Sequence, residues 1–327
     1  MRSNSIDTVR LIASFFVIIL HVGYYEDISH TFGELVRISG RWAIPFFFLV
    51  SGYFIGLAKK EDECYLQSFK IVKILFASSI LYLPYCFVKN PDYLDTISIF
   101  HILKTGTYFH LWFLSSMVFG LLSFQLLYRL PDNWLALISF FLILFFIVTD
   151  VWSYTESKNV LTNLHGLIRH TMSLAFIILG YLLAKKFDLR KLSLGLLDKC
   201  LIFFLCAFFF IEPMIIEWIT SSNAMLRQFP VFTFAISIGI FITCLKVNIN
   251  SNLLAYAGKY HSLGIYLVHP LFIPVFFKSF SYLQVPPTIP TLMMSFFCSW
   301  VFVIFLMKYV PFLYNFLYGN YSLIRKL

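Results

Sequence analysis

The stretch IDTVRLIASFFVIILHVGYY, residues 6–25, is an apolar run long enough to cross a lipid bilayer as a single helix. It carries Arg10 near its start and His21 near its end. Charged and titratable side chains are costly inside a bilayer, so those that occur there are typical of functional positions. The run therefore predicts a membrane-spanning helix that carries two functional side chains.

The composition of the whole chain agrees with a membrane protein. Of its 327 residues, 60% are hydrophobic and 13% are charged, with a mean hydropathy of +0.82. Because apolar runs recur along residues 1–327, we expect one domain with no appended soluble domain. The predicted fold is all-α, a polytopic integral membrane bundle of about ten transmembrane helices, near 7–25, 42–58, 71–88, 110–128, 134–150, 164–184, 200–220, 229–246, 261–278 and 290–314.

The N-terminal run has a second interpretation as a secretory signal peptide, because Arg2 and Arg10 precede an apolar core. Asp7 is unusual in such a basic leader, and no small-residue cleavage site follows the run. The apolar character also continues to Tyr25. We therefore interpret the segment as a retained first helix.

Lysine and arginine are unevenly distributed between the two sides of the predicted bundle. They are more numerous on the side that would hold both termini, which predicts that the N-terminus and the C-terminus are cytoplasmic. The loop 185–199 would then be cytoplasmic, and the loop 26–41 would face outward. In a bacterial cell this describes a multi-pass protein of the plasma (inner) membrane. The lysines and arginines that set this topology also account for the net charge of +9. No nucleic-acid partner is therefore expected.

Arg10 and His21 lie on one face of the first helix. Eleven residues of about 100° each make three turns plus about 20°, and a rise of about 1.5 Å per residue separates them by about 16 Å. Arginine suits phosphate or carboxylate, and histidine can take and return a proton. The pair predicts a phosphate-bearing donor at one membrane edge and group transfer deeper in the bilayer. Alternatively, the Arg10 side chain only extends to the lipid headgroups, and His21 only forms a buried hydrogen bond.

Four stretches in this order resemble the acyltransferase-3 family of membrane acyltransferases. The first, IDTVRLIASFFVIILH, has the family's arginine, ten residues and then histidine, at Arg10 and His21. The others are WAIPFFFLVSGYFIG at 42–56, HLWFLSSMVFGLL at 110–122 and GKYHSLGIYLVHPLF at 258–272. Together they cover nearly the whole chain.

The resemblance implies transfer of an acyl group, usually acetyl from acetyl-CoA, to a hydroxyl of a carbohydrate. Members of this length are similar to O-acetyltransferases that modify O-antigen (lipopolysaccharide), capsule or exopolysaccharide. On this basis His21 is the general base and Arg10 contacts the phosphates of the donor or organises the site. The expected partners are acyl-CoA, a free or lipid-linked carbohydrate acceptor and membrane lipid. No metal is expected.

The chain departs from the family at one place. Family members often carry arginines after the second helix, where this chain has Lys70 and Lys73. Lysine binds phosphate through a single ammonium group, but it lacks the planar guanidinium with which arginine donates two hydrogen bonds to one phosphate. We retain Lys70 and Lys73 as candidate donor-binding residues.

Acceptor binding is assigned to His110 and Trp112 at the predicted outer mouth of the fourth helix. There an imidazole could meet a sugar and an indole could stack on it, although interfacial anchoring explains both residues as well. Asp7 precedes Arg10 by three residues, close enough for an ion pair. A carboxylate at a helix N-terminus is also simply favourable.

Ser51, Gly52 and His269 are secondary site candidates. Ser51 and Gly52 allow close approach of a substrate to the backbone, and tight helix packing explains them equally well. For the glutamates of the seventh span, Glu212 and Glu217, we expect neutral burial or pairing with a cation such as Arg169 rather than a catalytic role.

Two other functions remain open. Any polytopic bundle with intramembrane arginine and histidine could be a permease, although the sequence lacks the internal repeat expected of one. A polysaccharide export component without enzymatic activity is the other alternative, and it should tolerate loss of His21.

Overall fold

The computed structural model describes residues 3–58, 63–89, 98–152, 170–186, 195–220, 225, 227–247, 249 and 251–320. These residues form helices and connecting turns, with no β-strand among them. The helices are α1 (Asn4–Val22), α2 (His30–Ser39), α3 (Ala43–Ala58), α4 (Glu63–Lys89), α6 (Ile99–Thr105), η1 (Phe109–Leu111), α7 (Trp112–Leu127), α8 (Asp132–Trp152), α10 (Thr171–Lys186), α11 (Leu196–Thr220), α12 (Thr233–Lys246), α13 (Asn252–Tyr260), α14 (Ser262–Tyr282), α15 (Thr288–Tyr309) and α16 (Pro311–Leu317).

The prediction of an all-α membrane bundle is confirmed. Within the described ranges, eight helices are long and apolar enough to cross a membrane, and 171–185 and 233–246 are shorter apolar helices. The predicted helix 290–314 is in fact two, because α15 ends before Pro311 and α16 begins there. The first helix ends at Val22 rather than at residue 25, because Gly23 has a φ of +154° that helices do not adopt.

The 26–41 segment, predicted as a loop, contains the helix α2. The Ser29 side chain accepts a hydrogen bond from the Phe32 N–H at 3.2 Å and so caps the start of this helix. Three predicted features fall on positions outside the described residues: the first part of the 164–184 span, Arg169, and residues 187–194 of the 185–199 loop.

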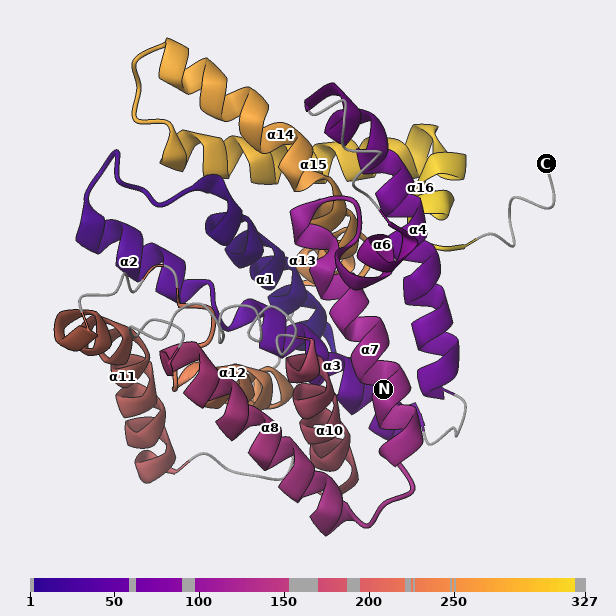
Figure 1. Cartoon of the computed structure of the whole chain (residues 1–327), viewed down its shortest axis with the longest axis vertical. Helices are drawn as coiled ribbons and strands as arrows, with labels where there is room; N and C mark the ends of the chain where they lie inside the picture. The colour runs from indigo at the N-terminus through magenta and orange to yellow at the C-terminus, as the bar shows by residue number, and fades with distance from the viewer. Residues whose placement is uncertain are drawn as a thin grey trace.

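Figure 1 shows how the long helices are arranged around α1 and α3. Helices α14 and α15 pack against each other on one side of the bundle, and α8, α10 and α11 lie on the other side. Between them, α1 contacts α3, α13, α14 and α15. The first helix is therefore an interior element of the fold.

Helices α3 and α10 approach each other through small residues. A Cβ atom on Gly52 would lie 2.0 Å from the Ile177 carbonyl oxygen, and one on Gly180 would lie 2.1 Å from the Leu49 carbonyl oxygen. Close helix crossings inside membranes use small residues in this way. Gly52 thus serves the packing of α3 against α10, and its role as a secondary site residue stays a prediction.

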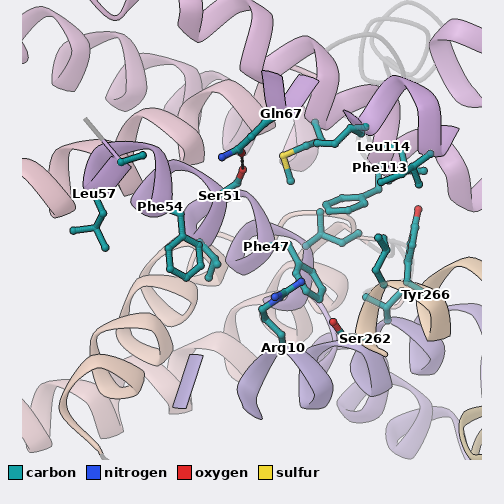
Figure 2. Close-up of a pocket in the computed structure, with 18 residues that line it drawn as sticks. Arg10, Phe47, Ser51, Phe54, Leu57, Gln67, Phe113, Leu114, Ser262 and Tyr266 are labelled. Carbon is teal, nitrogen blue, oxygen red and sulfur yellow. Dashed lines mark hydrogen bonds between the residues drawn. The ribbon is translucent and has the colours of Figure 1, made fainter. Parts of the chain in front are cut away.

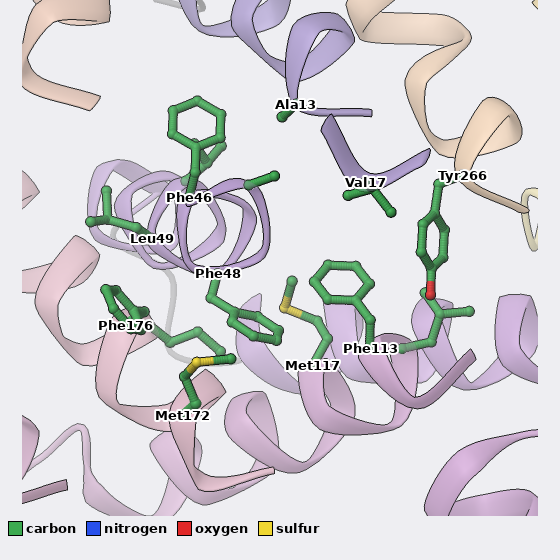
Figure 3. Close-up of a cluster of buried hydrophobic side chains, with 14 of the residues drawn as sticks. Ala13, Val17, Phe46, Phe48, Leu49, Phe113, Met117, Met172, Phe176 and Tyr266 are labelled. Atoms are coloured by element: carbon green, nitrogen blue, oxygen red, sulfur yellow. The ribbon is translucent and has the colours of Figure 1, made fainter. Parts of the chain in front are cut away.

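Aromatic and aliphatic side chains fill the space between the central helices. Figure 3 shows Val17 of α1, Phe48 of α3 and Phe113 of α7 as members of one buried cluster. The Phe48 and Phe113 rings are stacked with their centroids 4.9 Å apart. This cluster is buried within one continuous core, which fixes the positions of the helices that carry the candidate site.

The first turn of α1 is fixed by a contact with α13. A Cβ atom on Gly258 would lie only 1.6 Å from the Asp7 carbonyl oxygen, so no residue but glycine fits there. Gly258 opens the fourth family-like stretch, GKYHSLGIYLVHPLF. Its role in the fold is to let α13 reach the backbone of α1 just before Arg10.

Candidate functional site

Arg10 lies at a cavity of about 540 Å³ between α1, α3, α4, α7 and α14 (Figure 2). The lining is mainly apolar, with aromatic rings from Phe47, Phe54 and Phe113. Arg10 is the charged residue of the described lining, which also includes Ser51, Gln67, Ser262 and Tyr266. A mainly apolar cavity with one cation in its described lining suits a flexible ligand that carries negative charge at one end.

Asp7 orients the Arg10 guanidinium. The Arg10 Nη1 atom donates to Asp7 Oδ1 at 3.1 Å, and the Asp7 side chain is 4% exposed. The predicted ion pair is therefore present. The backbone of Asp7 is fixed by the packing of α1 against α13, and the Arg10 side chain points into the cavity.

The polar residues that α3 and α4 contribute to this cavity do not include the two candidate lysines. Ser51 contacts Gln67 with its hydroxyl 3.4 Å from the amide oxygen (Figure 2), and both residues line the cavity. Lys70 and Lys73 are absent from the described lining, and the Lys73 ammonium lies over the Phe69 ring at 4.4 Å. Neither lysine shares the described lining of this cavity with Arg10, and their role in donor binding stays a prediction.

His21 lines a second, smaller cavity of about 150 Å³. The candidate Trp112 is also part of its lining, together with Arg41 and Gln228. Ile44 lines both this cavity and the Arg10 cavity. The two predicted residues thus lie on one helix but in different cavities, which adjoin at Ile44.

A hydrogen bond between two histidines fixes the position of the His21 ring. His21 Nδ1 lies 2.8 Å from His269 Nε2. The ring planes differ by 16° and the centroids are 5.0 Å apart, as expected when two imidazoles meet edge to edge. The structure therefore brings the secondary candidate His269 into contact with the principal one.

The partners of His269 determine which nitrogen of each ring carries a proton. His269 Nδ1 lies 2.8 Å from the Tyr266 carbonyl and 3.2 Å from the Ile265 carbonyl, and carbonyls only accept. In the neutral ring Nδ1 is therefore the donor, and Nε2 accepts from His21 Nδ1. Neutral His21 is left with a lone pair on Nε2, which is the form that a general base requires.

Pro270 makes the Tyr266 carbonyl available for this bond. In a regular helix that carbonyl would accept from the N–H of residue 270, which proline lacks. The freed carbonyl instead accepts from the side chain of His269, as buried backbone groups in membrane proteins require. The consecutive residues His269 and Pro270 thus set the hydrogen-bond direction at His21.

His110 lies inside the bundle, which differs from its predicted place at the outer mouth. It is 1% exposed, with its ring centroid 5.7 Å from that of His269, and it is absent from the described lining of both cavities. Its carbonyl accepts a hydrogen bond from the Tyr266 hydroxyl. His110 thus packs beside His269 inside the bundle. Its role in binding an acceptor stays a prediction.

Arg37 is a residue whose place near the site the sequence pattern did not indicate. Its Nη1 donates to the carbonyls of Leu20 at 3.1 Å and Gly23 at 2.6 Å, which caps the C-terminal end of α1 beside His21. The sequence places Arg37 and Arg41 in the first outer loop, where they could contact a polyanionic or sugar acceptor, with solvated loop charges as the default interpretation. Arg41 lies beyond the end of α2, and its Nη2 donates to the Met225 carbonyl, which also accepts from Arg37 Nε.

Glu212 pairs with a cation, as expected, and its partner among the described residues is Arg227, whereas Arg169 lies outside them. The Glu212 carboxylate lies 3.0 Å from Arg227 Nη1, and Arg227 Nε donates to Asp150 at 2.7 Å. The Arg227 side chain is fully buried. This group joins α8, α11 and the residues before α12, and it balances charge inside the fold.

Comparison with known proteins identifies the family of this chain. Residues 3–314 match the family described as an acyltransferase domain, of the acyltransferase-3 type. A stretch of 139 residues is 30% identical to an amino-acid racemase of Enterococcus faecalis, covering 39% of this chain and 20% of the racemase. The chain thus spans about a fifth of that relative. No solved structure matches.

Proposed function

The chain belongs to the acyltransferase-3 family of membrane acyltransferases, and from this premise we propose that it transfers acetyl from cytoplasmic acetyl-CoA to a hydroxyl of a cell-surface glycan. The observation that carries the proposal is the pair of adjoining cavities on α1, one with Arg10 and the other with His21. The first suits a phosphate-bearing acyl donor, and the second holds a group able to activate a hydroxyl.

The Arg10 cavity has the properties needed for the acyl donor. Its volume of about 540 Å³ lies within the range of about 300–1,000 Å³ typical of small-molecule sites. A coenzyme A thioester has a phosphate-rich nucleotide end and a flexible, weakly polar arm. Arg10 would bind the phosphates, while Phe47 and Phe113 line the path of the arm.

His21 would perform the proton transfer. Its Nε2 lone pair takes the proton of the acceptor hydroxyl as the oxygen attacks the thioester carbon. The new carbon–oxygen bond forms, the carbon–sulfur bond breaks, and the leaving thiolate recovers the proton from His21. His269 accepts a hydrogen bond from His21 Nδ1 at 2.8 Å throughout, which favours the protonated ring.

The proposed orientation places the two substrates on opposite sides of the membrane. With both termini cytoplasmic, Arg10 lies at the inner edge, and His21 lies about 16 Å farther along α1. The thioester arm would pass Ile44, the residue common to both cavities. The acceptor would enter the His21 cavity from the outer side, past Trp112, so the acyl group crosses while the nucleotide remains inside.

Mass spectrometry of surface polysaccharide tests the proposed reaction. Cells lacking the protein would be complemented with the wild type, with His21→Ala or with His101→Ala, a matched control on the surface helix α6. We expect one additional acetyl per repeat with the wild type and the control, and none with His21→Ala. Polysaccharide of equal mass in all strains would contradict the proposed function.

A further inference from the structure

Three potential metal ligands meet at the end of α2 opposite Arg37. His30 and Glu34 lie one turn apart on α2, and Glu217 comes from the last turn of α11. His30 Nε2 lies 3.6 Å from Glu34 Oε1 and 3.4 Å from Glu217 Oε1. One ligand atom from each residue lies within 4.8 Å of the other two.

These separations are longer than those of charge-assisted hydrogen bonds, which are about 2.7–2.9 Å. They match the edge of a tetrahedral metal site instead, because bonds of about 2.1 Å place neighbouring ligands about 3.4 Å apart. The helical spacing of His30 and Glu34 also directs both side chains to one face, as in helical zinc motifs.

The charge balance of the cluster requires either a proton or a cation between its carboxylates. The Glu34 side chain is only 8% exposed, yet its carboxylate faces a second one from Glu217. Within the described residues, its ion-pair partner is His30 of the same cluster. Two neighbouring carboxylates, one of them buried, repel each other unless a proton or a cation lies between them.

We propose that His30, Glu34 and Glu217 bind a zinc ion. One imidazole nitrogen and two carboxylate oxygens are ligands that zinc accepts, and water can complete the tetrahedron. The His30 side chain is 53% exposed, which leaves a route for the ion and room for the water. The site is separate from the two cavities, since none of the three residues lines either one.

The ion would join α2 to α11 and thereby stabilise the end of α1. Arg37 of α2 donates to the carbonyls of Leu20 and Gly23, which flank His21. Zinc binding would therefore restrict movement of the segment that holds the proton-transfer residue. The sequence does not indicate this site, because Glu217 is separated from His30 by 187 residues.

Equilibrium dialysis of the purified, detergent-solubilised protein without a polyhistidine tag tests the proposal, with zinc chloride as the probe. The variants are His30→Ala and the nearly isosteric Glu217→Gln, and His101→Ala removes an exposed histidine elsewhere as a control. We expect one zinc per wild-type or His101→Ala molecule. Each cluster variant should bind zinc at least about tenfold more weakly, in line with the sensitivity of metal sites to lost partners.

Thermal unfolding provides a second readout that does not depend on activity. Zinc should raise the unfolding temperature of the wild type and of His101→Ala, and it should not raise that of Glu217→Gln, because only binding to the folded state stabilises it. Acidification should release the ion as the ligands protonate. Failure of the wild type to bind zinc, or equal affinity in Glu217→Gln, would overturn the proposal.

Discussion

The two ends of α1 hold cavities that differ in size, charge and hydrogen bonding. The Arg10 end opens into about 540 Å³ of mainly apolar space, with the arginine held by Asp7. The His21 end opens into about 150 Å³, with the histidine held by His269. One end carries a permanent charge in a space large enough for a flexible ligand, and the other carries a proton acceptor in a confined one.

Under the proposed function, this difference separates donor binding from proton transfer along a single helix. A permanent cation contributes affinity for an anionic ligand but cannot exchange protons, whereas a neutral imidazole can. Removing either group should therefore change a different kinetic constant. The following substitutions test that division, beginning with the largest expected effect.

His21→Ala should reduce kcat by roughly 10²–10⁴-fold, the usual contribution of general acid–base catalysis. The KM for acetyl-CoA should change little, because Arg10 and its cavity remain. Acetyl transfer by the purified protein, with His101→Ala as control, measures both constants. A large rise in KM with unchanged kcat would instead place His21 in donor binding.

Ile44→Trp should obstruct the junction between the cavities, because the larger side chain fills space that both share. We expect transfer to fall at least about tenfold while acetyl-CoA still binds, since overfilling a packed site costs about 1–3 kcal/mol. Ile44→Val is the matched control and should remain close to wild type. Full activity of the tryptophan variant would show that the acyl group does not pass this residue.

Arg10→Lys keeps the positive charge but removes the two-pronged donor that Asp7 orients. We expect the KM for acetyl-CoA to rise about tenfold, with a smaller change in kcat, because bidentate phosphate contacts are lost. Titration of donor concentration measures the effect. An unchanged KM would mean that charge alone is required at this end of α1.

Pro270→Ala should have the smallest effect, because it restores a backbone N–H that competes with His269 for the Tyr266 carbonyl. We expect kcat to fall by about threefold, from the partial loss of one hydrogen bond of about 1 kcal/mol. Pro274→Ala, one turn farther along α14, is the matched control. Equal kcat values in the two variants would show that Pro270 does not help to orient His21.

The sequence predicted the features that depend on local spacing. Long apolar runs located the spanning helices, and a separation of three residues gave the Asp7–Arg10 ion pair. The short helix α2 was missed because its length and its polar residues are typical of a loop. The division of the last predicted span at Pro311 would have been visible from the proline alone.

Contacts between residues far apart in the sequence could be identified only from the three-dimensional structure. His21 and His269 are 248 residues apart, and only the packing of α14 beside α1 brings them together. The same holds for Glu212, whose partner Arg227 comes from the segment before α12. A single sequence gives the polar residues of membrane helices but not their partners, because no periodicity connects distant helices.

Sealed, oriented vesicles provide the most direct test of transfer between the two ends of α1. Labelled acetyl-CoA would be supplied to the face that exposes the termini, and a glycan acceptor to either face. We predict labelled glycan when the acceptor is on the opposite face, and its loss in the Ile44→Trp variant. Product formed only when donor and acceptor share the face with the termini would contradict transfer across the membrane.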